Sequence, residues 1–223
     1  MTQNRNLTNK LIALTCVFLF FVPFLAFAQN DQVNSLLHSI SEKYKIEDGN
    51  VVIQKVIEFE NISKDNLYLS AKEYLTSNYG SFKEVLQVDD KENGLIIIKG
   101  LFADIYCNDE KIFGYYGIEH KIWHILKIDI KDNRVRLTIS MNKVEYRTAA
   151  VPQYNIQAQD YVEYLTEYCP IKKRDVSTKP EKRKCDCEGY VFYKAINRAL
   201  NTIDSMELFI KKSSLKIRQN DDW

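Results

Sequence analysis

The sequence predicts an α+β domain of two layers, in which an antiparallel five-stranded sheet is covered on one face by helices. Two observations lead to this prediction. Four segments alternate apolar and polar residues with the period of a half-buried strand, and a fifth is an almost continuous apolar run. Two amphipathic segments have the period of a helix, one after the first strand and one near the C-terminus. The order strand, helix, four strands, helix is typical of an α+β domain.

Composition excludes some classes of protein. The 223 residues include 31 Lys and Arg against 30 Asp and Glu, and 45% are apolar. Neither a disordered acidic chain nor a strongly basic nucleic-acid binder has this balance. A chain of this length buries enough apolar surface to fold without a metal or a disulfide.

Residues 1–28 have the three parts of a secretory signal. Arg5 and Lys10 form a basic start, and an uncharged apolar run follows from Leu11 to Phe24. Ala26-Phe27-Ala28 then supplies the small residues of a cleavage site. We expect cleavage between Ala28 and Gln29. The apolar run is shorter than the ~20 residues that span a bilayer, so a signal is favoured over an anchor. Cys16 lies inside the run, which argues against a lipoprotein. The mature protein is therefore expected in the periplasm or cell envelope, without a transmembrane segment.

The first part of the mature chain is predicted to form a polar arm, then a strand, then a helix. Residues 29–49 are a polar arm with a weak apolar pattern, and alternation from Val51 to Phe59 predicts a strand. Ser63 is a candidate N-cap for a helix that carries Asp65 in its first turn. Gly80 is the expected C-cap of this helix.

Four further strands are expected, with one apolar and one polar face. Their turns contain the pairs Asn93-Gly94 and Asp132-Asn133, both of which suit a tight hairpin, and a longer connection is expected around Cys107 and Gly114. The predicted strands are Phe82 to Val88, Leu95 to Ala103, Ile118 to Ile130 and Val135 to Val144.

The remainder is less regular until its last helix. Residues 147–189 form an irregular segment in which a short helix is expected near Asp160 to Tyr168, and Ile171 to Lys184 reads as an exposed basic loop. Residues 190–211 are an amphipathic helix, followed by a tail at 212–223. One short helix cannot cover five strands, so we expect this C-terminal helix to pack beside the Ser63 to Asn78 helix on the apolar face. Its apolar stripe contains Phe192, Ile196, Ala199 and Ile203.

Residues 50–146 resemble a known family. The resemblance rests on Lys55-Val56-Ile57-Glu58, on the helix from Ser63 through Tyr74-Leu75, on the Asp90 to Gly94 turn and on Ile128 to Arg136. These segments are similar to a domain of unknown function with a TBP-like fold, found mainly in exported Bacteroidetes proteins. Tyr74 and Asn133 depart from the family, where Trp and Gly are usual. The family has no established activity, so the resemblance implies a fold and no functional residues.

The motifs of common enzymes are absent from the sequence. There is no Gly-x-Ser-x-Gly or His-Glu-x-x-His, and the 7 glycines offer no phosphate loop. The carboxylate pairs Asp89-Asp90 and Asp221-Asp222 fit solvated positions. His120 and His124 lie about 13 Å apart on a strand, too far for one metal. We therefore expect neither a cofactor nor a metal.

Four cysteines remain in the mature chain, and an oxidising compartment favours disulfides over zinc. A bridge from Cys169 to Cys185 or Cys187 is expected to close the basic loop, with Cys107 free to pair with the remaining thiol. A bridge between Cys185 and Cys187 would close a strained small ring, and four cysteines allow three pairings.

The polar sheet face is the candidate binding surface. Lys121, Trp123 and Lys127 alternate on one strand, beside Arg136 on the next. An aromatic side chain among cations can be a binding platform. In the alternative interpretation, the C-terminal segment covers Trp123.

Two functions are consistent with the sequence. The leading hypothesis is an exported, non-catalytic binding or interaction module that meets an unknown envelope protein or ligand. The alternative is a small-molecule-binding or hydrolytic envelope protein with a site that the sequence does not reveal. The basic loop could bind nucleic acid or anionic lipid, but export argues against nucleic acid and a solvated charge run is the simpler interpretation.

Overall fold

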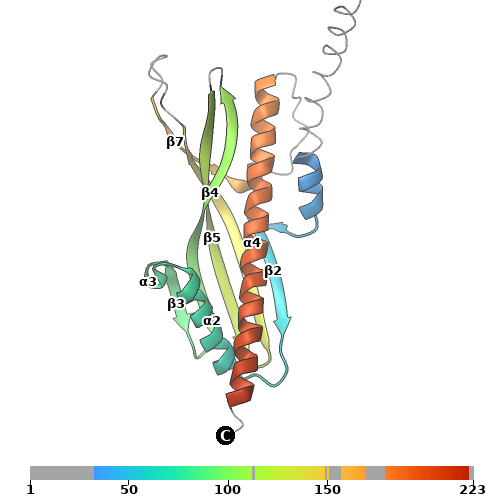
Figure 1. Ribbon diagram of the computed structural model, residues 1–223, viewed down its shortest axis with the longest axis vertical. Helices are drawn as coiled ribbons and strands as arrows, with labels where there is room; N and C mark the ends of the chain where they lie inside the picture. Colours follow the sequence, from blue (N-terminus) through green and yellow to red (C-terminus); the bar gives the residue numbers. More distant parts are fainter. Residues whose placement is uncertain (1–32, 112–113, 149, 151–156, 169–178, 221–223) are drawn as a thin grey trace, which may run out of the picture.

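The computed structural model describes residues 33–111, 114–148, 150, 157–168 and 179–220, with backbone alone at 108–111, 114–117, 179–185 and 214–220. These residues form an antiparallel sheet of seven strands with helices along one face (Figure 1). The predicted α+β class is therefore confirmed. The order across the sheet is β1 (Lys45–Glu47), β2 (Asn50–Glu58), β6 (Arg134–Arg147), β5 (Gly114–Lys131), β4 (Leu95–Lys111) and β3 (Leu86–Asp90), and β7 (Asp160–Tyr164) pairs with β6.

The sheet has two strands more than predicted. β1 folds back on β2 through Asp48 and Gly49, which both have positive φ, so the predicted polar arm contains a strand. β7 lies where a short helix was expected, and that expectation was wrong. Pairing with residues 143–147 of β6 keeps Asp160–Tyr164 extended, and the chain turns only afterwards, in the 3-10 helix η2 (Leu165–Glu167).

Two helices cover the apolar face of the sheet. α2 (Lys64–Asn78) packs on one part of it, and α4 (Lys179–Asn220) runs along the whole length of the molecule beside it (Figure 1). The side chains of α4 that the sequence placed on its apolar stripe are buried against the sheet and α2. Residues 33–40 form a further helix. The fully buried stripe consists of Phe192, Ala195, Ile196, Ala199, Ile203, Met206 and Ile210.

The N-cap of α2 is the predicted one, but its C-cap is not. The Ser63 hydroxyl accepts from the Asn66 amide at 3.3 Å, and Asp65 lies in the first turn. The helix ends at Asn78, and the extended residue Tyr79 donates its N–H to the Leu75 carbonyl. The C-cap expected at Gly80 was therefore wrong: this glycine does not have positive φ, and it lies in a turn between Tyr79 and the next helix.

After α2, β3 begins later than predicted and is shorter, whereas β4, β5 and β6 are longer than predicted. Phe82–Val85 is the short helix α3 in place of the start of a strand, because Phe82 and Val85 turn toward the core. β4 continues to Lys111, so the connection expected around Cys107 is part of a long hairpin with β5. A β-bulge lies between Phe102 and Ile105 of β4, and Asp104 within it has a φ of 58°. The bulge interrupts the alternation of side chains, and beyond it the buried side chains again point to the face that the helices cover.

The hairpin of β5 and β6 turns through Asp132 and Asn133, as predicted, but only Asn133 has positive φ. Asn133 accepts at Oδ1 from the Ile62 amide at 2.8 Å and donates its own N–H to the Ile62 carbonyl at 3.0 Å. Asp132 accepts at Oδ1 from the Lys64 amide at 2.7 Å. The turn is therefore fixed to the connection that leads into α2. Asn fits here because it adopts the left-handed region more readily than most residues.

α4 begins at Lys179, eleven residues before the predicted start at Tyr190. The last part of the expected basic loop is therefore helical, and the expectation of a loop through Lys184 was wrong. Residues 169–178, with the rest of that loop, and residues 1–32, with the predicted signal, lie outside the described residues. Among the residues that are described, no helix has the length and apolar character that crossing a membrane requires.

One disulfide joins α4 to the sheet. Cys107 of β4 is bonded to Cys187 of α4, 80 residues later. A bridge from Cys169 to Cys187 is therefore wrong, because Cys187 is occupied; a bridge from Cys169 to Cys185 lies outside the described side chains. No feature of the sequence favoured Cys107 as the partner, because the predicted strand ended at Ala103, before Cys107.

Candidate functional site

The sheet face opposite α2 and α4 is the candidate site, and we call it the open face. Residues of β5 with even numbers from Ile122 to Ile130 are buried under the helices, so the odd-numbered residues between them point to the other side. No described helix lies over this side. It carries Val52, Gln54 and Val56 of β2, Arg134, Arg136 and Thr138 of β6, Lys121, Trp123, Ile125, Lys127, Asp129 and Lys131 of β5, Ile97, Lys99, Leu101 and Tyr106 of β4, and Val162 and Tyr164 of β7.

Exposed apolar side chains gather on the open face. Six of the ten large apolar residues that are exposed in the described structure belong to it, as strand alternation and pairing show. Val56 is 49% exposed and Ile125 is 47% exposed, and Ile125 lies on the central strand β5, which is paired on both sides. Scattered exposed apolar residues are normal, but a concentration on one face is typical of an interaction surface. The six are Val56, Leu101, Tyr106, Ile125, Val162 and Tyr164.

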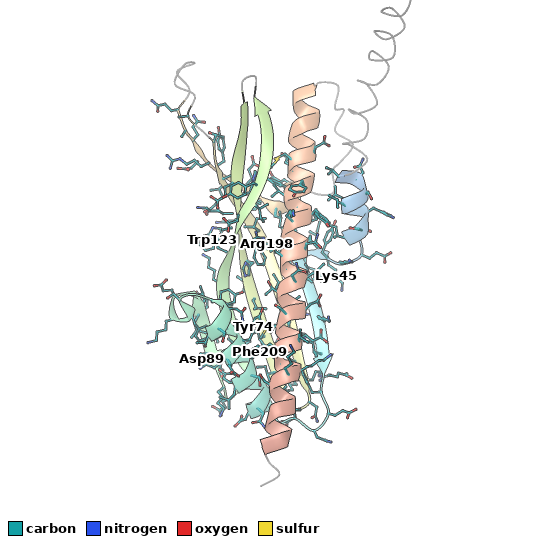
Figure 2. All side chains as sticks on the ribbon, viewed as in Figure 1. Lys45, Tyr74, Asp89, Trp123, Arg198 and Phe209 are labelled. Atoms are coloured by element: carbon teal, nitrogen blue, oxygen red, sulfur yellow. A yellow bond between two sulfur atoms is a disulfide. The ribbon has the colours of Figure 1, made fainter. Side chains whose placement is uncertain are left out.

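Trp123 lies near the middle of the open face (Figure 2). Its register partner is Leu101 of β4, and the Lys99 ammonium lies 4.7 Å from the centroid of its ring. This distance suits a cation–π contact. α4 packs on the opposite face, so the interpretation in which the C-terminal segment covers Trp123 is wrong. Lys121, two residues earlier, has only a 4.0 Å contact with Glu119.

Lys127 and Arg136 are brought together by a carboxylate that the sequence did not single out. Asp129 lies 3.1 Å from the Lys127 ammonium and 3.0 Å from the Arg136 guanidinium. Arg136 and Asp129 are also register partners across β5 and β6. The cations predicted for this face therefore form two groups, one around Trp123 and one around Asp129. Strand alternation would have found both Lys99 and Asp129.

A depression of about 200 Å³ opens beside Asp129, at the end of the open face next to the Asp132-Asn133 turn. It is smaller than the ~300–1,000 Å³ typical of pockets for drug-sized ligands. Charged side chains from two strands line it around one apolar residue of a third. The lining residues are Val56, Asp129, Lys131, Arg134 and Arg136.

A second group of polar residues is buried under the N-terminal part of α4. The Tyr146 hydroxyl donates to Glu163 at 2.9 Å, and the His120 ring lies 5.1 Å from that of Tyr146 and 6.4 Å from that of Tyr168. Burial, and next the Glu163 carboxylate, raise the pKa of Tyr146 and of Tyr168. Burial lowers the pKa of His120, which is 4% exposed. A substrate would have no access to this imidazole, so the group suits a structural role.

His124 is buried in the core rather than presented to a ligand. Its ring stacks on Phe102 at 3.9 Å and lies directly above Gly100, where a Cβ atom would come within 2.5 Å of Nε2. Burial lowers the pKa of His124 to about 4, so the ring is neutral at physiological pH. Neither histidine therefore offers a free imidazole.

Asp89 also has a structural role. It accepts hydrogen bonds from the Lys72 ammonium and from the Tyr68 hydroxyl, and both lower the pKa of the Asp89 carboxyl. Within the described part of the chain, His, Cys, Asp and Glu residues form no group of three or more that could hold a metal ion.

Residues 54–146 match a family model described as a domain of unknown function (DUF4468) with TBP-like fold. Two solved structures are similar to this chain. A TBP-like protein from Parabacteroides distasonis ATCC 8503 has 18% identity and a TM-score of 0.46, with 74% of this chain and 98% of that chain covered. A DUF4468 family protein from Bacteroides ovatus ATCC 8483 has 13% identity and a TM-score of 0.47, with 74% and 91% covered. No curated protein matches the chain.

Proposed function

We propose that this chain, whose residues 54–146 form a DUF4468 domain with TBP-like fold, is an exported, non-catalytic binding module that docks a protein partner on its open face. The observation that carries the proposal is the concentration of exposed apolar side chains on that face. A sheet that needed only to be soluble would present polar residues at Leu101 and Ile125.

The composition of the open face favours a protein partner. Its exposed core contains Trp and Tyr side chains as well as aliphatic ones, and charged residues of both signs surround them, which is the pattern of protein–protein interfaces. Ile125 is paired with strands on both sides and Trp123 is paired with Leu101 of β4, so the surface is formed before the partner arrives. Such preorganisation lowers the entropic cost of binding.

Two features support export. The basic, apolar and small-residue parts of residues 1–28 have the order of a secretory signal. The Cys107–Cys187 disulfide suits an oxidising compartment such as the periplasm. N-terminal sequencing of protein from the envelope fraction is expected to begin at Gln29, and an intact Met1 there would contradict the proposal of export.

Photocrosslinking in the native cell tests the docking surface. A photoreactive phenylalanine analogue replaces Leu101 or Ile125 on the open face, and Leu69 of α2 or Leu208 of α4 as controls. Leu69 and Leu208 are 58% and 54% exposed, so they are at least as accessible as the test positions. We expect a discrete protein adduct from the open-face positions alone.

A second variant separates docking from chance proximity. Ile125→Asp replaces an apolar side chain of the surface by a charged one and should abolish the adduct formed from Leu101, whereas Leu208→Asp should leave it unchanged. Equal adducts from all four positions, or none from the open face in cells that contain the folded protein, would contradict the proposal.

A further inference from the structure

The charged depression at the end of the open face carries an inference beyond protein docking. It combines three cations with one carboxylate, in a volume of about 200 Å³. The cations are Lys131, Arg134 and Arg136, and the carboxylate is Asp129. The formal charge of the lining is therefore +3 − 1 = +2.

The single carboxylate does not neutralise the cations nearest the turn. Asp129 already contacts Lys127 and Arg136. Neither Lys131 nor Arg134 has a carboxylate oxygen within 4.0 Å among the residues that the structure describes, even though Arg134 is the register partner of Glu58 on β2. Two positive charges in this depression thus have no ion-pair partner in the described part of the chain.

Lys131 and Arg134 are also register partners of each other across the hairpin. Like charges directly opposite on neighbouring strands destabilise a sheet. They cannot move apart by changing the turn, because Asp132 and Asn133 are hydrogen-bonded to Lys64 and Ile62. A repulsion that the fold holds in place is the kind of local conflict expected at a functional site.

We propose that this depression binds the phosphate group of a phosphate monoester. A monoester carries close to two negative charges at neutral pH, because its second pKa is about 6, and this charge matches the +2 of the lining. Arg134 and Arg136 supply guanidinium groups, which bind phosphate oxygens through paired N–H donors. Lys131 supplies a point charge, and Val56 offers apolar contact to the carbon side of the ester. The size of the depression suits one such group.

The phosphate could belong to a soluble ester or to the headgroup of a lipid such as phosphatidic acid. The inference does not rest on the protein partner, because Lys131 and Arg134 lie at the turn and not at the crosslinking positions. Titration calorimetry of the whole mature chain with phenyl phosphate tests the shared chemistry. Benzenesulfonate is the matched probe, since it has the same ring and a tetrahedral oxyanion with one charge.

We expect phenyl phosphate to bind at least about tenfold more tightly than benzenesulfonate, and Arg134→Gln and Lys131→Gln each to weaken it by about tenfold. Arg147→Gln and Lys83→Gln remove the same charges from exposed positions away from the depression and should leave binding unchanged. Equal affinity for the two probes, equal loss in test and control variants, or no binding by folded protein would overturn the inference.

A vesicle arm distinguishes the two sources. Sedimentation with phosphatidylcholine vesicles that contain phosphatidic acid, lost in Arg134→Gln and absent with phosphatidylcholine alone, would identify a lipid headgroup. Binding of phenyl phosphate without such sedimentation would identify a soluble ester. Sedimentation that Arg134→Gln leaves intact would contradict a role for the depression in lipid binding and assign the lipid contact to another surface.

Discussion

The sheet has two halves that are stabilised in different ways. In the two-helix half, β2, β3 and residues 95–102, 122–131 and 134–141 of β4, β5 and β6 lie under α2 and the C-terminal part of α4. In the single-helix half, the ends of β4, β5 and β6 and the strand β7 extend beyond α2, beside the N-terminal part of α4 (Figure 1). The bulges of β4 and β6 both lie at the boundary between the halves.

The interior of each half reflects how many helices cover it. The two-helix half is filled mainly by aliphatic side chains such as Ile53 and Ile139. Lys55 of β2 joins the sheet to α4, since it contacts Asp204 at 2.8 Å and Glu207 at 2.6 Å. The single-helix half buries His120, Glu188 and Tyr168, contains the hydrogen bond from Tyr146 to Glu163, and has a disulfide. In this half a covalent bond and polar contacts are added to the apolar packing of α4.

Removal of the disulfide should cause the largest change in the relative stability of the two halves. The double variant Cys107→Ser and Cys187→Ser frees a loop of 80 residues, for which the chain-entropy account gives about 4.5 kcal/mol. We expect the N-terminal part of α4 and the β4–β5 hairpin to lose protection in hydrogen exchange before the two-helix half does. Uniform loss of protection across both halves would show that the molecule unfolds as one unit.

The variant Ile196→Asp tests the burial of α4 near the boundary. Ile196 is fully buried, so an unpaired carboxylate there should lower the free energy of unfolding by about 3–5 kcal/mol. Leu208→Asp on the same helix is the control, since Leu208 is 54% exposed and the change should stay within about 0.5 kcal/mol. Urea unfolding measures both; equal stabilities of the two variants would mean that α4 does not pack as described.

The third prediction concerns the effect of pH on the two-helix half. The pKa of His124 is about 4 in the folded protein and 6.5 when unperturbed, so the unfolded chain takes up a proton first as pH falls. The stability that comes from a neutral His124 is therefore complete above pH 6.5 and is lost as pH falls toward 4, by about 3 kcal/mol in all.

Urea unfolding at several pH values in this window measures the slope. His124→Phe keeps a ring on Phe102 and should reduce the pH dependence, while the remaining slope reflects His120 and the paired carboxylates. An unchanged slope in His124→Phe would mean that His124 titrates normally in the folded state.

The smallest expected effect concerns the contact between the two helices. The Tyr74 hydroxyl lies 2.6 Å from Ser205 Oγ and 3.4 Å from the Thr202 carbonyl, and its ring meets that of Phe209 at 5.7 Å (Figure 2). Tyr74→Phe keeps the ring contact and removes the hydroxyl, so the free energy of unfolding should fall by about 1 kcal/mol. Ser205→Ala should give a similar loss, and the double variant less than the sum.

Prediction from sequence succeeded where local periodicity and tertiary burial agree. β5 and β6 alternate strictly, and the structure buries the residues that the pattern placed inside. Prediction failed where pairing overrides local preference. Asn108 to Lys111 are residues typical of turns, yet they continue β4 because β5 pairs with them, and Asp160–Tyr164 is extended because β6 lies beside it. Such long-range partners leave no local signal.

The same distinction applies to the candidate site. Lys121, Trp123, Lys127 and Arg136 were placed on one face by alternation alone, and strand pairing agrees. How these side chains group depends on two further residues that were not predicted from the sequence. Lys99 lies on the neighbouring strand β4 and contacts Trp123, and Asp129 lies on β5 and contacts Arg136. Predicting the depression would also have required the register of the β5–β6 hairpin, because that register places Lys131 opposite Arg134.

The Asp132-Asn133 turn also has a consequence for the order of assembly. The segment that leads from β2 into α2 takes its position from Asn133, whose side chain and backbone hold Ile62 across 71 residues of sequence. As a chain is synthesised from its N-terminus, that segment emerges long before its anchor. The β5–β6 hairpin, by contrast, is local and can form as soon as residue 147 is available. We therefore expect the native entry into α2 to form only after the β5–β6 hairpin has formed.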